Sequence, residues 1–291
     1  MQNVGLSWQQ GAALTAALSA ATLGARWAPA RTQPSWLRPR AALPFLRESA
    51  LLAGLYSLWQ LAGSLSVLGT HGAFTRARYL ERIEHDLHLP SEASVQQSIT
   101  GHPLLVQACN LYYATMHFGV LFVFLLWLFT RHRSEYARWR TTLVLLTAGC
   151  LLIQLIPVAP PRLLPGYIDT AAQYGQSVYG LGLSTDQLSA MPSVHVGWAV
   201  LICWVVVRTS RSRWRWLSIL HPLITTFVVV ATANHFWLDG VGAILVLLLS
   251  AWLQRGARSM TARWQAHHRA VRAGPQDSAG AGHVLVSPRG N

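Results

Sequence analysis

The sequence predicts an all-α integral membrane protein, with a six-transmembrane-helix core bundle and a possible extra helix at the N-terminus. Three observations carry this prediction. Of the 291 residues, 52% are hydrophobic. Only 11% are charged, whereas about a quarter are charged in an ordinary soluble domain. The apolar residues also gather in segments of about 20, the length of a membrane-spanning helix.

The apolar segments divide the chain into three parts. Six of them qualify as core helices: 48–69, 103–130, 141–159, 192–208, 216–233 and 236–254. Residues 1–25 are apolar and rich in Ala, but no basic residue precedes them, so they match a secretory signal poorly. They are expected to form an interfacial or a seventh helix. The predicted parts are an N-terminal segment (1–47), a membrane domain (48–255) and a disordered tail (256–291).

The arginines indicate the orientation in the membrane. The chain has 23 basic residues, all of them Arg, and loops rich in Arg alternate with loops that have few. The rich loops are 26–47, 131–140, 208–215 and the chain after residue 254. Positive residues favour the cytoplasm, so the tail is expected inside, and segments 70–102 and 159–191 outside. This placement explains the net charge of +13 better than nucleic-acid binding does.

Polar residues from three separate segments meet at the expected outer face of the cell membrane. Arg162 follows the prolines that end the third core helix. Ser193 and His195 begin the fourth helix, where free N–H groups suit an anion. His235 and Asp239 begin the sixth helix, and their spacing of four residues places them on one helical face. An ionisable pair inside a span is costly and usually functional.

The HxxxD pair has a catalytic and a structural interpretation. The carboxylate of Asp239 can hold one tautomer of His235, which leaves the other ring nitrogen as a nucleophile or base. Taken alone, such a pair is more often a buried hydrogen-bonded contact, and it lacks the third clustered ligand of a metal site. With Arg162 and the PSVH turn on the same face, catalysis is the better interpretation.

Three motifs stand in a familiar order: APPRLLPGYIDT, AMPSVHVGWA and ATANHFWLDG. They resemble the signatures of the type-2 phosphatidic acid phosphatase superfamily, and most closely its inositol phosphorylceramide synthase-like branch. The resemblance covers residues 48–254. It implies a metal-independent enzyme without a cofactor, whose substrate is a phospholipid or lipid phosphate and whose acceptor is a lipid alcohol or water. No obligate protein partner is expected.

The resemblance also implies a role for each motif residue. His235 is expected to attack phosphorus and form a phosphohistidine, with Asp239 orienting its ring. His195 is expected to protonate the departing alkoxide and then to act as base on the acceptor. Arg162 and Ser193 are expected to hold phosphate oxygens.

Two positions depart from the phosphatase pattern. Leu155 stands where KxxxxxxRP has its lysine, and Val229 stands where SRxxxxxHxxxD has its arginine. A phosphodiester carries one negative charge and a phosphomonoester nearly two, so the reduced set of cations favours a diester. The predicted function is transfer of a phospho-headgroup, such as inositol phosphate, from a glycerophospholipid to a lipid alcohol.

Four further residues are possible substrate contacts. Asn110, Tyr113 and His117 fall on one face of the second core helix, and Asn234 precedes His235. His117 is expected ~21 Å below the outer end of its helix, where interhelical packing is the simpler role. Two other functions stay open: a lipid phosphate phosphatase that uses water, and a transporter with a His/Asp proton relay. The transporter interpretation predicts inverted repeats, which are not evident.

Overall fold

The computed structural model describes residues 7–27, 42–64, 71–177 and 185–273. Its elements are α1 (Trp8–Trp27), α2 (Ala42–Ser64), α3 (Ala73–Asp86), α4 (Glu92–Thr100), α5 (Pro103–Arg131), α6 (Arg133–Gln154), η1 (Pro161–Leu163), α7 (Thr170–Gln173), η2 (Thr185–Leu188), α8 (Val194–Thr209), η3 (Arg213–Ile219), α9 (Leu220–Ala231) and α10 (Trp237–Ala273). Within these ranges the one β feature is a parallel bridge between Val158 and Ser189. The all-α prediction is confirmed.

Three helical stretches of the described chain are long and apolar enough to cross a membrane. They are Pro103–Arg131, Arg213–Ala231 and Trp237–His268. The first, α5, has 29 residues and therefore reaches ~43 Å, which exceeds the ~30 Å hydrocarbon core of a bilayer. α8 is also apolar but has only 16 residues. These helices indicate an integral membrane protein.

The last helix is longer than the sequence predicted. α10 continues to Ala273, whereas the sequence predicted a core helix that ends at residue 254 and a disordered tail from 256. Ala, Arg and Gln are frequent beyond residue 254, and all three favour helix over coil. The chain forms two compact units, the second of which starts at Ala251 and is described as far as Ala273.

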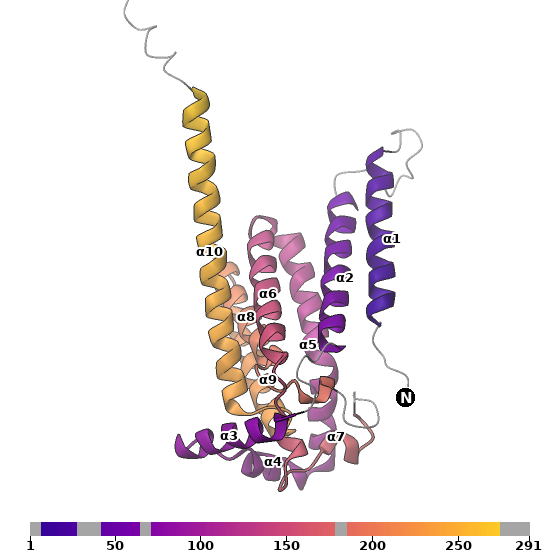
Figure 1. Cartoon of the computed structure of the whole chain (residues 1–291), viewed down its shortest axis with the longest axis vertical. Helices are drawn as coiled ribbons and strands as arrows, with labels where there is room; N and C mark the ends of the chain where they lie inside the picture. The colour runs from indigo at the N-terminus through magenta and orange to yellow at the C-terminus, as the bar shows by residue number, and fades with distance from the viewer. Residues whose placement is uncertain (1–6, 28–41, 65–70, 178–184, 274–291) are drawn as a thin grey trace, which may run out of the picture. The chain divides into compact units, whose positions relative to one another are not determined.

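The N-terminal helices α1 and α2 lie side by side (Figure 1). They approach closely because small residues face each other. A Cβ on Gly11 would collide with the hydroxyl oxygen of Ser57, and Gly54 faces Thr15 across the same pair of helices. Small residues at such contacts are typical of helix pairs in membranes. The expected N-terminal helix is therefore present as the packing partner of α2.

The main apolar core lies between α5, α6, α8 and the first part of α10. Its buried side chains include Leu128, Leu146, Leu201 and Leu247, one from each helix. Gly197 on α8 allows this close packing, because a Cβ there would lie 3.3 to 3.4 Å from Leu146 and Ala243. An ion pair between Arg140 and Glu48 joins α6 to α2.

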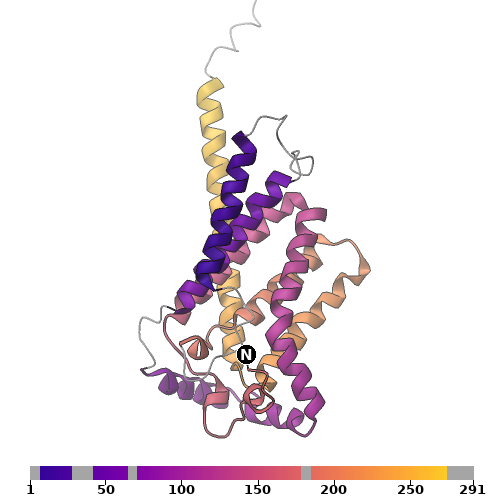
Figure 2. The ribbon, with the colours of Figure 1, turned by 90° about the vertical axis from the view of Figure 1, so that its right-hand side faces the viewer.

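Short elements gather at one end of the bundle, around α3, α4 and α7 (Figures 1 and 2). We call the described residues of 71–102 and 155–193 the end layer. A second apolar cluster holds this layer on the start of α10; its buried members are Ala73, Ala77, Val158, Ala159, Leu164, Leu188, Ala190 and Phe236. The two segments that the sequence assigned to the outer face thus form one folded layer.

Candidate active site

The starts of α8 and α10 share a cavity of about 250 Å³ next to the end layer. Arg162, His195 and His235 all line it, although they come from three separate segments of the chain. Asn234 and, from α5, Tyr113 also belong to its wall. The structure thus brings to one cavity three of the five residues that topology alone predicted to meet.

His235 does not lie within α10, as the four-residue spacing predicted, but in the turn before it. The turn is tight, since Ala233 has a positive φ of 53° and the His235 N–H donates to the carbonyl of Val229 at 3.1 Å. Asp239, in the first turn of α10, reaches back toward this turn. Its Oδ2 accepts the N–H of Phe236 at 2.9 Å and lies 3.3 Å from Nδ1 of His235.

The Nδ1 atom of His235 has two acceptors. The carbonyl oxygen of Ala190 lies 2.8 Å away, closer than the carboxylate of Asp239. Neither a carbonyl nor an ionised carboxylate can donate a hydrogen bond, so Nδ1 carries the proton. In the neutral imidazole Nε2 therefore keeps its lone pair, and it is buried without a hydrogen-bond partner among the described residues. Nε2 is the atom available for attack.

Ser193 caps α8 and does not belong to the described cavity wall. Its hydroxyl accepts the N–H of Val196 at 3.4 Å, and its own N–H donates to the backbone carbonyl of Asp239 at 3.0 Å. α8 begins at Val194, so Pro192 precedes the helix instead of starting it. Ser193 thus joins the starts of α8 and α10, and its contact with phosphate stays a prediction.

His195 is held by aromatic rings. Its ring stacks on Tyr113 with centroids 4.5 Å apart and meets the edge of His117 at 4.3 Å. The centroid of His235 lies 5.6 Å away. Nε2 of His195 has no hydrogen-bond partner within the described ranges. Among the described residues, His195 thus sits beside the nucleophile candidate without a hydrogen bond that would assign its proton to one nitrogen.

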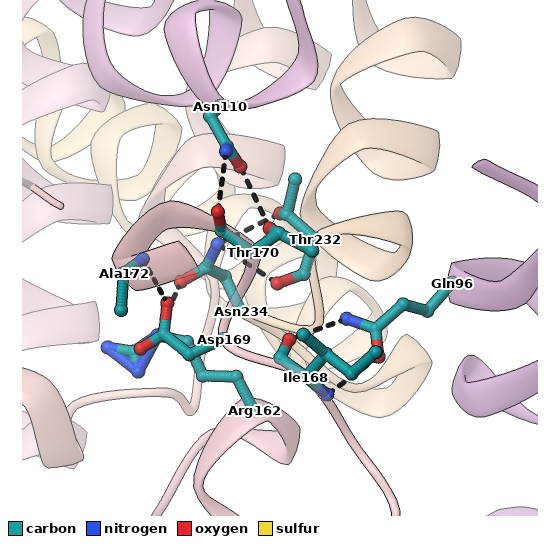
Figure 3. Close-up of polar contacts among 9 residues, drawn as sticks. All are labelled: Gln96, Asn110, Arg162, Ile168, Asp169, Thr170, Ala172, Thr232 and Asn234. Atoms are coloured by element: carbon teal, nitrogen blue, oxygen red, sulfur yellow. Dashed lines mark hydrogen bonds and ion pairs between the residues drawn. The ribbon is translucent and has the colours of Figure 1, made fainter. Parts of the chain in front are cut away.

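Arg162 enters the cavity wall from η1 and is almost fully buried. Its backbone N–H donates to the carbonyl of Ala233 at 2.8 Å, and its Nε donates to Oδ1 of Asn234 at 3.0 Å. The carboxylate of Asp169 lies 3.8 Å from Nε (Figure 3). Asn234 therefore orients the guanidinium, while Asp169 offsets part of its positive charge.

Asn110 holds the end layer and is not part of the described cavity wall. Its amide nitrogen donates to the carbonyl of Thr170 and to the side chain of Gln176, both at 3.1 Å. Its Oδ1 accepts the Thr170 hydroxyl at 2.9 Å (Figure 3). These bonds anchor the start of α7, directly after Asp169. Asn110 therefore supports the loop that faces Arg162, and its contact with substrate stays a prediction.

His117 lines the cavity, although its depth in α5 favoured interhelical packing at first sight. The cavity continues between α5 and α8 as far as Phe118 and Trp198, and so it reaches His117. The Nδ1 of His117 lies 3.0 Å from the carbonyl of Tyr113, which can only accept, so Nδ1 carries the proton there. Tyr113 and His117 are thus both in reach of a ligand in this cavity.

Sequence reasoning missed some of the wall. Gln154 lines the cavity, and its side-chain nitrogen donates to the carbonyl of Pro192 at 3.0 Å. A glutamine in the last turn of an apolar helix was a usable signal. The carbonyl of Ala190 left none, because a backbone acceptor is the same in every residue. In the part of the chain that the structure describes, no three His, Cys, Asp or Glu side chains are grouped to bind a metal ion.

Comparison with known proteins identifies the family. The model of the PAP2 superfamily matches residues 78–253, more than half of the chain, and this range contains every wall residue named above. No curated protein and no solved structure matches the chain. Enzymes of this superfamily are metal-independent phosphatases and phosphotransferases that act on phosphate esters. The chain belongs to the PAP2 superfamily.

Proposed function

We propose that the protein is a membrane lipid phosphotransferase of the inositol phosphorylceramide synthase-like type. It moves a phospho-headgroup, such as inositol phosphate, from a glycerophospholipid to a lipid alcohol through a phosphohistidine. The observation that carries this proposal is the state of His235. Ala190 and Asp239 hold its Nδ1, while Nε2 stays unengaged among the described residues, in the wall of a cavity that Arg162 shares. A histidine held in this way is a preformed nucleophile.

The proposed membrane arrangement is a core of six helices, with α1 as an extra helix. The core helices are α2, α5, α6, α8, α9 and α10. The turn between α5 and α6 carries Arg131 and Arg133 at the end of the bundle opposite the end layer (Figure 1). Since basic residues favour the cytoplasmic side, the end layer and the cavity face the extracytoplasmic side, and the C-terminal tail lies in the cytoplasm.

In the first step, Nε2 of His235 attacks phosphorus, and the ester bond between phosphorus and the glycerolipid oxygen breaks. His195 gives its proton to the departing oxygen, which leaves as a diacylglycerol. The imidazolium of His235 gains stability from the carboxylate of Asp239, 3.3 Å from Nδ1. Arg162 stabilises the negative charge that develops on the nonbridging oxygens.

In the second step, an alcohol takes the phosphoryl group. His195, now neutral, removes the proton of the acceptor hydroxyl as its oxygen attacks phosphorus, and the bond between phosphorus and Nε2 breaks. The same residue thus acts first as acid and then as base. Its contacts with aromatic rings, in place of a fixed hydrogen bond, support this double use.

The charge of the cavity supports a diester substrate. Among the described wall residues Arg162 is the one permanent cation, and the nearby carboxylate of Asp169 offsets part of its charge. Leu155 and Val229, which replace the cations of the phosphatase pattern, are not part of this wall. A phosphomonoester with nearly two negative charges would meet less compensation here than a diester with one.

The second candidate is a lipid phosphate phosphatase, in which water accepts the phosphoryl group. Membership of the PAP2 superfamily favours it, because that family includes phosphatases of phosphate monoesters. Its substrate would be phosphatidic acid or a polyprenyl (pyro)phosphate. The same membership argues against the transporter interpretation.

Mass spectrometry of the purified protein with a mixed lipid extract tests the proposal. The wild type is compared with His235→Ala, and with His85→Ala as control, since the His85 side chain is 90% exposed. A new headgroup-bearing lipid with matching diacylglycerol, formed by the wild type and by the control but not by His235→Ala, supports the transferase. Free phosphate without a new lipid supports the phosphatase. Equal products from wild type and His235→Ala contradict both.

A further inference from the structure

Two acidic side chains are buried in the end layer, beside the start of α10. Glu84 on α3 and Glu92 on α4 are each only 3% exposed, and both line one hollow of the end layer. A hydrogen bond between two carboxyl groups needs a proton, because two ionised carboxylates can only accept. Oε2 of Glu84 and Oε1 of Glu92 have no donor in the described part of the protein, so one shared proton satisfies both.

Glu84 also binds the first turn of α10. Its Oε1 accepts the backbone N–H of Leu238 at 2.7 Å. One residue earlier, the indole N–H of Trp237 donates to the carbonyl of Pro90 at 2.8 Å. Leu238 directly precedes Asp239 and stands three residues after the nucleophile candidate. The end layer therefore holds the short segment between His235 and Asp239, and the positions of these two residues depend on it.

We propose that Glu84 is a positioning residue for the nucleophile His235, and that the proton it shares with Glu92 keeps it in place. This inference rests on the proposed function, since it concerns the same site. Glu84 does not line the described cavity wall and acts through the backbone of Leu238. The turn that carries His235 is thus held from the end layer by a buried carboxyl pair that shares one proton.

The surroundings of the pair explain why it keeps this proton. Burial, the hydrogen bond to Glu92, and the negative charges of Glu92 and Asp239 raise the pKa of Glu84 to about 9, against the smaller opposing effect of the Leu238 N–H. Other titratable or charged groups line the same hollow: Glu81, Arg82, His85, Asp86 and Tyr167. The Tyr167 hydroxyl donates to Glu81 at 3.1 Å.

The direction of the pH effect follows from this raised pKa. An acid whose pKa is higher in the folded protein favours folding most at low pH, and this contribution is lost as the pH rises through the folded value. For Glu84 this contribution to folding is lost as the pH rises from about 4.5 to about 9. Above that range two negative charges face each other next to Asp239, and their repulsion displaces the Glu84 carboxylate from the Leu238 N–H, although an ionised carboxylate is the stronger acceptor. Turnover is expected to fall with an alkaline limb near pH 9.

The test compares Glu84→Gln with Glu84→Ala. The amide oxygen of glutamine still accepts the Leu238 N–H, whereas alanine cannot. We expect Glu84→Ala to lower kcat by roughly 10- to 100-fold, as small misplacements of reacting groups do, with KM nearly unchanged. Glu84→Gln should keep kcat at neutral pH and lose the alkaline limb. Glu81→Gln, on the same helix, is the matched control and should keep the wild-type pH profile.

Hydrogen exchange provides a readout that does not depend on activity. The amide of Leu238 should exchange slowly in the wild type and in Glu84→Gln, and fast in Glu84→Ala. Slow exchange in Glu84→Ala, or an alkaline limb that survives in Glu84→Gln, overturns the inference. If His235→Ala retains full turnover, the proposed function fails, but the exchange result still decides whether Glu84 holds the turn.

Discussion

The starts of α8 and α10 each present a histidine to one cavity, but they hold it differently. His195 lies inside its helix, as the second residue of α8, and packs between the rings of Tyr113 and His117. His235 lies before its helix, and the carbonyl of Ala190 and the carboxylate of Asp239 hold its Nδ1.

This difference matches the two chemical roles that we propose for these histidines. A nucleophile needs one nitrogen deprotonated and aimed at phosphorus throughout the reaction, and two acceptors on the opposite nitrogen of His235 provide that. An acid that later becomes a base must carry a proton at one moment and lack it at the next. Aromatic packing holds the ring of His195 without favouring either state through a hydrogen bond, so it suits this second role.

The largest expected effect comes from removing the nucleophile. His235→Asn should reduce turnover more than ~10³-fold with every substrate, including an activated nitrophenyl phosphodiester, because the proposed mechanism forms its covalent intermediate on His235. The measurement is the burst of nitrophenol in single-turnover mixing. A burst in this variant would show that another group attacks phosphorus.

His195→Asn should slow transfer from a natural lipid by about 10²- to 10⁴-fold, the usual contribution of general acid–base catalysis. A nitrophenol leaving group needs no acid, so the burst should survive in this variant. The phosphorylated protein should then accumulate, since no base activates the acceptor, and intact-protein mass spectrometry detects it. Loss of the burst in His195→Asn would mean that His195 is needed for the attack itself, and the two histidines would then not have separate roles.

Asp239→Asn should reduce kcat by a smaller factor, on the order of 10². The carbonyl of Ala190 lies closer to Nδ1 than the carboxylate does, so the tautomer of His235 is retained. What is lost is the negative charge that stabilises the imidazolium. A loss as large as in His235→Asn would mean that the carboxylate alone sets the tautomer, and undiminished activity would remove Asp239 from the mechanism.

The smallest expected effect concerns the orientation of Arg162. Asn234→Ala removes the acceptor of its Nε, and a hydrogen bond of about 1 kcal/mol corresponds to roughly a fivefold rise in KM. The exposed Ser94→Ala on α4 is the control. Steady-state kinetics measures both variants, and a change in kcat without a change in KM would contradict a role in binding phosphate.

Much of this architecture was readable from the chain. The apolar segments predicted helices that the structure contains, and α5 begins at the expected residue 103. The order of Arg162, His195, His235 and Asp239 along the helices also predicted which of them would meet. These inferences succeed because helix length and topology depend on local composition and on the membrane, and both are written into the sequence.

Other features depended on contacts between distant segments. Asn110 turned out to bind α7, Ser193 to cap α8, and His117 to line the cavity. Each of these residues can play either a packing or a ligand role, and residue type does not choose between them. Whether such a residue packs or contacts a ligand depends on which residues from distant parts of the chain lie next to it in the fold.

The sequence by itself determined the helical class, the presence of long apolar helices and the convergence of Arg162, His195 and His235, because these follow from hydrophobic length and from the order of the helices. Only the tertiary structure decided which groups hold the His235 ring and which residue supports the segment that follows it. The carbonyl of Ala190 comes from 45 residues away, and Glu84 from 154 residues before Leu238. Backbone acceptors and buried carboxyl pairs act through geometry, which no residue pattern records.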